Sequence, residues 1–374
     1  ENLSQRSNVE IAFEIMLPYI GTSIPEKELM RILEDTLSFD FPLRQINEQI
    51  YTLELFHGPT LAFKDLGARF LSRCLGYFAA SIGRKITVLV ATSGDTGGAV
   101  ADAFYQVEGT EVIILYPSGK VSPVQEKQLT TMGGNIYALE VAGDFDDCQH
   151  MVKMAFADKD LKSRFFLTSA NSINISRWLS QQIYYAIALK QWHEKEQPIV
   201  SVPSGNFGNL CAGLLAQRSG LEIDHFIAAC NKNDVFTRYV STGLYEPNDS
   251  HATISNAMDV GNPSNVIRIL ELFKHQHKQI SHQISSESIS DDLTAKTIKE
   301  VYQTYEYIMD PHTAVAYAAL KNWIEMKPSK KGIILSTAHP VKFPSIVEKN
   351  IGRSVPVPSS VETILGKEKR ATLV

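Results

Sequence analysis

The sequence predicts an α/β protein with parallel sheets flanked by helices. From Lys85 onward, short apolar runs rich in β-branched and bulky residues alternate with segments of helical periodicity. This alternation is typical of strands joined by crossover helices. The length of 374 residues favours two domains over one small core. In such folds, ligands bind at the carboxyl ends of the strands.

Each expected strand is a short run of β-forming residues that ends in a turn. The expected strands are residues 86–91, 112–116, 136–141, 199–203, 226–229 and 333–336. Helices are expected between them, where helical periodicity follows a cap or a proline. The expected helices are residues 97–106, 123–131, 145–156, 176–192, 210–217 and 312–326. The Ser-rich polar segment 278–292 is expected to form a surface loop or insertion.

The composition excludes several classes of partner. Lys and Arg number 36 against 41 Asp and Glu, a net charge of −5, and the basic residues are scattered among acids. Neither nucleic acid nor an anionic membrane surface is therefore expected as a partner. The hydrophobic content of 44% is that of an ordinary globular protein. We expect small-molecule partners and a monomer or homodimer.

The cysteines and the N-terminal residues indicate a cytoplasmic protein. Cys74, Cys148, Cys211 and Cys230 show no C-x-x-C spacing, so neither a zinc site nor a disulfide framework is predicted. No apolar run reaches the roughly 18 residues of a membrane span, and acidic residues occur where a signal peptide would be apolar.

Lys64 is the first candidate functional residue, because its neighbours Leu61, Ala62, Phe63 and Leu66 are apolar. Apolar surroundings favour the uncharged amine, which can react with an aldehyde. Asp65 would oppose this effect if it faced the same way. The alternative is an ordinary surface lysine at the start of a helix.

Three turns that follow predicted strands could carry ligands. Residues 92–99 (TSGDTGGA) and 204–209 (SGNFGN) lead into helices, where glycines and free N–H groups can hold a carboxylate or phosphate. Neither has Walker A or dinucleotide-binding spacing, so ATP and NAD are not expected. For residues 92–99, a turn capped by Ser93 or Thr96 remains an equal alternative. Thr337 ends the last strand, where its hydroxyl could face a heteroaromatic nitrogen or simply form a turn.

These segments resemble the threonine synthases, a family in the tryptophan-synthase-β-like class of fold type II pyridoxal phosphate enzymes. The similar blocks extend over nearly the whole chain. They are residues 53–70 (LELFHGPTLAFKDLGARF), 91–99 (ATSGDTGGA), 114–127 (ILYPSGKVSPVQEK), 169–177 (SANSINISR), 200–209 (VSVPSGNFGN), 255–260 (SNAMDV) and 336–340 (STAHP).

The resemblance implies pyridoxal 5'-phosphate as the cofactor, with a Schiff base at Lys64, which also serves as the catalytic base. It implies a reaction of O-phospho-L-homoserine with water to give L-threonine and phosphate, by γ-elimination and β-addition of water. The enzyme would be a carbon–oxygen lyase acting on phosphates in the last step of threonine biosynthesis. The implied cofactor residues are Lys64, Gly205, Asn206, Phe207, Asn209 and Thr337.

The resemblance also implies residues that bind the substrate. Its carboxylate would bind at Thr92, Ser93, Asp95 and Thr96, and its phosphate at Lys120, Ser172, Asn174 and Arg177. For Arg177 the alternative is a surface ion pair. No metal site is expected, because the loose histidine cluster at residues 275, 277 and 282 lies in a polar segment with no acidic ligands in register.

The expected domains are a large cofactor-binding domain, residues 1–84 plus 181–374, and a smaller mobile substrate-binding domain, residues 85–180. Closure of the mobile domain would exclude water. The family's usual bacterial form also has a leading segment, with a glycine-rich stretch and a proline, that the printed chain does not contain. That segment would help shape the rim of the active site.

Two other functions remain open from the sequence. One is a related phospho-amino-acid lyase or a threonine or serine dehydratase, which would release a 2-oxo acid. The other is a non-catalytic descendant that keeps the fold for binding. The product formed from O-phosphohomoserine distinguishes a threonine synthase from the lyase or dehydratase. Uptake of pyridoxal phosphate distinguishes an enzyme from the non-catalytic descendant.

Overall fold

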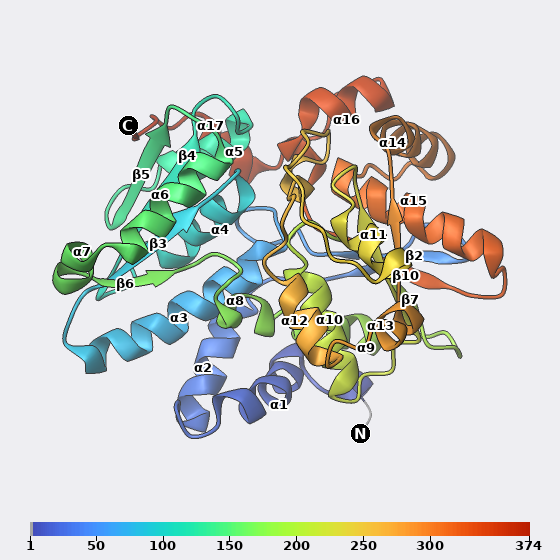
Figure 1. Cartoon of the computed structure of the whole chain (residues 1–374), viewed down its shortest axis with the longest axis horizontal. Helices are drawn as coiled ribbons and strands as arrows, with labels where there is room; N and C mark the ends of the chain where they lie inside the picture. The colour runs from blue at the N-terminus through green and yellow to red at the C-terminus, as the bar shows by residue number, and fades with distance from the viewer. Residues whose placement is uncertain (1–2) are drawn as a thin grey trace. The chain divides into compact units, whose positions relative to one another are not determined.

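The structure is a computed structural model that describes residues 3–374 (Figure 1). By their internal contacts these residues form two compact units. The first unit takes the residues up to Ile15, Phe39–His57 and Gln181–Val355, and the second takes Met16–Ser38, Gly58–Ser180 and Pro356–Val374. Each unit has its own, mostly parallel sheet, and this confirms the predicted α/β class.

The units differ from the expected domains at several boundaries, since residues 16–38 and 58–84 belong to the second unit. Helix α3 (Lys64–Ile82) belongs to the second unit, because Ala68 and Leu71 on α3 share a hydrophobic core with α4 (Asp95–Phe104). The residues after Val355 also belong to the second unit. That residues 85–180 move as a mobile domain relative to residues 1–84 plus 181–374 stays a prediction.

The second unit contains a parallel sheet in the order β11-β5-β4-β3-β6. Its strands are β3 (Ile86–Ala91), β4 (Thr110–Pro117), β5 (Ile136–Val141), β6 (Phe166–Ser169) and β11 (Thr372–Leu373). Alternate residues of β3 face opposite sides: Val88 and Val90 pack toward α3 and α4, whereas Leu89 and Ala91 pack toward α6 (Phe145–Ala157). Both faces are covered, which explains why this strand is continuously apolar.

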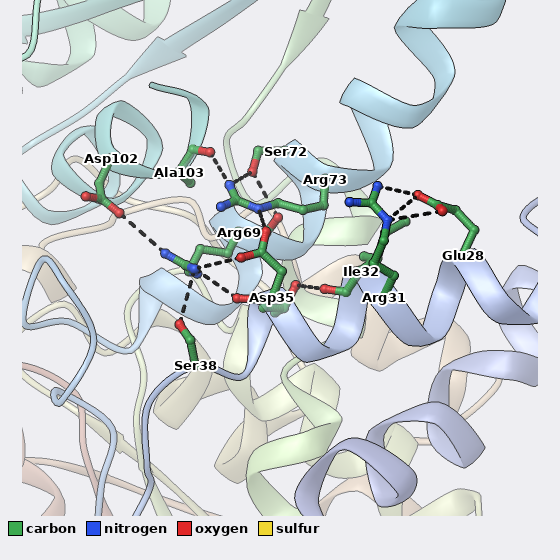
Figure 2. A network of polar contacts seen from close by, with 11 residues as sticks. Glu28, Arg31, Ile32, Asp35, Ser38, Arg69, Ser72, Arg73, Asp102 and Ala103 are labelled. Carbon is green, nitrogen blue, oxygen red and sulfur yellow. Dashed lines mark hydrogen bonds and ion pairs between the residues drawn. The ribbon is translucent and has the colours of Figure 1, made fainter. Parts of the chain in front are cut away.

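Two arginines one turn apart on α3 attach it to α2 (Glu26–Thr36) and to α4 (Figure 2). Arg73 pairs with Asp35 on α2, with Nε 2.5 Å from Oδ2, and Arg73 Nη1 donates to the carbonyl of Ala103. Arg69 Nη2 donates to the Asp35 carbonyl at 2.8 Å, and Arg69 Nη1 lies 3.8 Å from Asp102 Oδ2. These contacts fix the direction of the helix that begins at Lys64.

The remaining helices of the unit are α5 (Pro123–Thr130), α7 (Lys159–Arg164), α8 (Ile175–Leu179) and α17 (Ser359–Leu365).

The first unit contains a sheet in the order β1-β2-β10-β7-β8-β9, in which β1 is antiparallel and the other strands are parallel. Its strands are β1 (Leu43–Gln45), β2 (Ile50–Glu54), β7 (Ile199–Pro203), β8 (His225–Cys230), β9 (Ile284–Ser288) and β10 (Gly332–Ser336). Its helices are η1 (Leu3–Gln5), α9 (Gln182–Lys190), α10 (Gly208–Arg218), α11 (Val235–Thr242), η2 (Asn256–Met258), α12 (Val266–Leu272), α13 (His277–Gln283), α14 (Asp291–Tyr305), α15 (Pro311–Met326), η3 (Pro340–Lys342) and α16 (Pro344–Ile351). Helix α1 (Asn8–Ile20) runs from the first unit into the second. Within residues 3–374 no helix combines the length and apolar content of a membrane span.

Two expectations about elements were wrong. The polar segment 278–292 is not a surface loop, because it forms most of α13 and then β9, which pairs with β8 in the sheet. The single helix expected at 176–192 is two helices, α8 and α9, separated at Ser180 and Gln181. In β9 the serines are only partly buried and form hydrogen bonds to segments distant in the sequence, such as Ser286 to Thr237. At the break between α8 and α9, Gln181 is buried, at 4% exposure. Neither arrangement can be read from the local sequence pattern.

Replacing Arg73 tests the contacts that hold α3. Arg73→Leu removes the ion pair and leaves the Ala103 carbonyl without its donor, so we expect a loss of about 1–2 kcal/mol in the free energy of unfolding. Arg31→Leu is the matched control, because Arg31 is 71% exposed and only pairs with Glu28 on the same helix. We expect it to cost less than about 0.5 kcal/mol. Urea unfolding measures both, and equal losses would contradict the assignment.

The stability of the first unit should depend on the protonation of His225. Ser285 N donates to His225 Nε2 at 3.0 Å, so this nitrogen must be unprotonated, and burial lowers the pKa of His225 to about 4. Since the unfolded pKa is about 6.5, the unfolded chain binds the proton first as pH falls. The contribution is complete above about pH 6.5 and is lost between about pH 6.5 and pH 4.

His225→Asn removes this titration, so its urea midpoint should fall less steeply than the wild-type midpoint between pH 7 and pH 5. Parallel pH dependences would refute the prediction. Burial also lowers the pKa of His339 to about 4, so part of the pH dependence of the urea midpoint remains in the His225→Asn variant.

Candidate active site

Lys64 is the first residue of α3, and its side chain is mostly buried. It is 17% exposed, with Nζ 4.6 Å from the centroid of the Phe63 ring and 3.5 Å from Asp95 Oδ2. A lysine on a solvated helix face would be far more exposed. The amine therefore lies in the apolar setting that its neighbours indicate, with one carboxylate close by.

Asp65 faces the loop that precedes Lys64. Its carboxylate accepts hydrogen bonds from the backbone N–H and the hydroxyl of Thr60. A Cβ at Gly58 would collide with that carboxylate, so the close approach requires glycine. Gln128 on α5 donates to the Thr60 carbonyl at 3.0 Å. These bonds fix the backbone from which α3 begins.

The turn after β3 is capped by Thr92, and not by Ser93 or Thr96. Thr92 Oγ1 accepts from the N–H groups of Gly94 and Gly97, both at 2.9 Å. Within residues 3–374, the half-buried hydroxyls of Ser93 and Thr96 have no hydrogen-bond partner. The first-turn N–H groups of α4 have no acceptor inside the helix. The turn therefore offers donors to an anion, which fits a carboxylate.

Gln125 is a residue of this region that the sequence did not identify as functional. It is 2% exposed, and its side chain donates to Asp95 Oδ1 at 2.9 Å. A Cβ at Gly94 would lie 2.5 Å from Gln125 Cδ, so Gln125 packs directly on the turn. In the sequence, the spacing of Ser122 and Gln125 indicates a capping box. A capping box predicts the start of a helix and gives no indication of a functional role.

The expected substrate-phosphate residues have different surroundings. Arg177 is 3% exposed, which excludes a surface ion pair, and its Nη1 donates to the Ala170 carbonyl. Asn174 caps α8 through Oδ1 and donates to the Ser169 carbonyl, so both ends of its amide are engaged. Ser172 is half-buried and Lys120 is exposed. Their role toward a phosphate stays a prediction.

In the first unit, the loop between β7 and α10 is held by one close backbone approach and by side-chain contacts. A Cβ at Gly205 would lie 2.6 Å from Met258 Cα. Asn206 Oδ1 accepts from Ser264 N at 2.6 Å and from Ser264 Oγ at 2.9 Å. Phe207 caps α10 with a positive φ of 60°, and its ring lies 4.7 Å from the ring of Phe236.

Asn209 carries a donor that lacks an acceptor. Tyr185 donates to both the carbonyl and Oδ1 of Asn209 at 2.8 Å, whereas the buried Nδ2 has no hydrogen-bond partner within residues 3–374. Buried donors in native proteins are nearly always paired. A phosphate at the start of α10 would supply the acceptor, so the loop fits the phosphate of pyridoxal phosphate.

Thr337 lies at the same edge of the first unit's sheet as this loop, because β10 and β7 are parallel neighbours. Its side chain is 6% exposed and makes no hydrogen bond within residues 3–374. A free hydroxyl at this edge could form a hydrogen bond with a ring nitrogen.

The nearby histidines have structural partners: His339 Nδ1 accepts from Val341 N at 3.1 Å, and His57 Nε2 lies 2.8 Å from Glu54 Oε2.

The histidines of the 275–282 segment are also engaged. His277 Nε2 donates to the carbonyls of Tyr239 and Val240, and His275 pairs with Glu271. Across residues 3–374, no group of three or more His, Cys, Asp and Glu side chains could hold a metal ion. The predicted site residues thus fall on two units, with Lys64 and the substrate residues on the second and residues 205–209 and Thr337 on the first.

Comparison with known proteins gives matches over nearly the whole of this chain. A family model described as pyridoxal-phosphate dependent enzyme matches residues 37–337, and one described as threonine synthase, C-terminal, matches residues 313–374. The threonine synthase of Serratia marcescens is 44% identical over 96% of this chain and 83% of its own length. That of Haemophilus influenzae is 46% identical over 95% of this chain and 82% of its own length.

Solved structures agree with the sequence matches. The crystal structure of threonine synthase from Escherichia coli has a TM-score of 0.93 and 42% identity, covering 100% of this chain and 86% of that chain. The structure of pyridoxal-phosphate-bound threonine synthase from Brucella melitensis has a TM-score of 0.92 and 33% identity, covering 99% of this chain and 86% of that chain. The chain therefore belongs to the threonine synthases, which are pyridoxal-phosphate-dependent carbon–oxygen lyases.

Proposed function

We propose that the chain converts O-phospho-L-homoserine and water to L-threonine and phosphate. The observation that carries this proposal is the setting of Lys64: a mostly buried amine at a helix start, 3.5 Å from Asp95 Oδ2. The likeness to threonine synthases over 93–96% of the chain supports the same reaction.

Pyridoxal phosphate, when bound, supplies an electron sink that stabilises negative charge on the substrate. Lys64 would hold its aldehyde. The unpaired Nδ2 of Asn209 and the tight backbone at Gly205 support a phosphate seat at the start of α10. The free hydroxyl of Thr337 supports a contact with the ring nitrogen, which a neutral partner leaves largely unprotonated. The proposed cofactor residues are Lys64, Gly205, Asn206, Phe207, Asn209 and Thr337.

Lys64 is also the group proposed to move protons at the substrate's α- and β-carbons, since a free amine can accept a proton and the resulting ammonium can return it. Asp95 would hold the ammonium form between these transfers. Gln125 keeps the Asp95 carboxylate in place through its 2.9 Å hydrogen bond, which makes Gln125 a positioning residue.

The substrate's two anionic ends are assigned to different parts of the second unit. The turn that contains Ser93 and Thr96 would bind the carboxylate, where unpaired hydroxyls and helix N–H groups provide donors. Thr92 would stabilise the turn through its hydrogen bonds to the N–H groups of Gly94 and Gly97, and Asp95 would contact Lys64. For the phosphate we propose Lys120, Ser172, Asn174 and Arg177, of which the buried guanidinium of Arg177 is the strongest candidate for a dianion.

We further propose that the protein acts in the cytoplasm, as a monomer or homodimer. The support is that Cys74, Cys148, Cys211 and Cys230 are all buried, free thiols. Unpaired cysteines in this number are typical of reducing compartments.

The product formed from O-phosphohomoserine tests the proposed reaction. The holoenzyme should release threonine and phosphate in equal amounts, measured by chromatography and a phosphate assay. Release of 2-oxobutyrate without threonine would contradict water addition and would indicate a phospho-amino-acid lyase that stops at the 2-oxo acid.

Lys64→Ala should lower kcat at least about 10³-fold, because it removes the proton-transfer group and the cofactor's attachment. Lys85→Ala is the matched control, since Lys85 only pairs with Glu111 on the surface and should leave kcat within about twofold. Steady-state kinetics measures both variants. A Lys64→Ala variant with near-normal kcat would exclude Lys64 as the base.

A further inference from the structure

The SNAMDV block, residues 255–260, has no role in the proposed reaction, yet it touches the proposed phosphate seat. Its 3-10 helix η2 lies against Gly205, where a Cβ would be 2.6 Å from Met258 Cα and 3.1 Å from the Ala257 carbonyl oxygen. The two backbones are thus in direct contact, with no side chain between them to absorb a shift. Any displacement of η2 must move the loop that follows β7.

A buried histidine on α15 holds the start of η2. His312 Nε2 accepts the backbone N–H of Ala257 at 3.1 Å, and His312 Nδ1 lies 2.6 Å from Asp310 Oδ1. The side chains of His312 and Asp310 are 4% and 0% exposed. Because a backbone N–H can only donate, Nε2 must be unprotonated, so Nδ1 carries the hydrogen and donates to Asp310.

Asp310 is itself immobilised. It caps α15 by accepting from the backbone N–H of His312 at 2.9 Å, and its second oxygen accepts from the hydroxyl of Thr313. The ring of His312 also packs 4.9 Å from the ring of Phe343. The carboxylate therefore sets both the tautomer and the orientation of His312.

The other end of η2 is held by the segment that follows β8, the strand next to β7, and by Thr253. Asp259 Oδ1 accepts from Asn231 Nδ2 at 2.8 Å, Asn233 Nδ2 at 3.0 Å and Thr253 Oγ1 at 2.6 Å. The helix is thus fixed at both ends and presses on Gly205 from a defined direction. Hydrogen bonds at both ends keep η2 in one orientation relative to Gly205.

We propose that the Asp310–His312 pair positions the donors that bind the cofactor phosphate, acting through η2 and Gly205. This inference rests on the proposed phosphate seat at residues 205–209. Donors that bind an anion must be held to within a few tenths of an ångström, and groups behind them supply that rigidity. His312 and Asp310 are positioning residues, since neither is assigned a contact with the cofactor.

Titration of the apoprotein with pyridoxal phosphate, followed by fluorescence, tests this role. His312→Ala should weaken binding about tenfold, because the N–H of Ala257 loses its acceptor and η2 its anchor. His312→Gln should restore most of the affinity, since its amide oxygen can accept the same N–H. Asp310→Asn is a milder second variant, with an expected loss of about threefold.

His225→Ala is the matched control. His225 lies in the same unit and its ring stacks 5.6 Å from Trp323 of α15, but its hydrogen bonds go to Ser285 on β9. It should lower stability and leave the affinity for pyridoxal phosphate within about twofold.

Hydrogen exchange of the apoproteins provides a readout independent of the cofactor. His312→Ala should increase exchange selectively in residues 204–209 and 255–259, whereas a general loss of stability would raise it throughout the unit. Wild-type affinity and exchange in His312→Ala and Asp310→Asn would overturn the inference, as would an equal loss of affinity in His225→Ala.

Asn209→Ala, titrated in parallel, separates this inference from the proposed seat. Unchanged affinity in Asn209→Ala contradicts the seat itself and the inference with it. Weakened binding in Asn209→Ala but not in the His312 and Asp310 variants contradicts only the positioning role.

Discussion

The contact between Lys64 and Asp95 is the interaction on which the chemistry of the second unit depends. Each residue is the first of a helix, and the two charged groups lie 3.5 Å apart with side chains 17% and 3% exposed. A buried amine without a partner would be costly, and one fully surrounded by carboxylates could not react. The Asp95 carboxylate, itself hydrogen-bonded by Gln125, keeps the lysine in place.

This contact persists only if α3 and α4 keep their relative position. A Cβ at Gly67 would collide with the carbonyl of Arg177, so α3 lies directly against the segment that carries Arg177. Further along α3, the two arginines of Figure 2 attach it to α2 and α4. The second unit thus holds its reactive amine by backbone approach and by ion pairs about one to three helical turns away. The first unit uses backbone approach in the same way, at Gly205 and η2.

The sequence predicted strands that are short runs of mostly apolar, β-forming residues, such as β3 and β7, because such runs have few other uses. β3, β5 and β7 have the predicted bounds. It missed β9 (ISSES), whose serines bond to neighbouring strands and helices, for example Ser286 to Thr237 at 2.8 Å. A polar strand at the edge of a sheet has no local signal that separates it from a loop.

The candidate site shows the same division. Lys64 and the glycine-rich turns were visible because their neighbours in sequence are unusual. Gln125 and His312 were not, because each acts on a residue far away in the chain, Asp95 and Ala257. Thr92 was expected to touch the substrate, and its hydroxyl is instead engaged by two backbone N–H groups. Such assignments need the tertiary structure, since a threonine in a turn serves either purpose equally well.

Borohydride reduction of the protein loaded with pyridoxal phosphate, followed by peptide mass spectrometry, tests the central claim most directly. Reduction fixes the cofactor to the amine that holds it, and we expect one modified peptide, with the label on Lys64. A label on another lysine, such as the fully buried Lys342, or no label on any lysine, would contradict it.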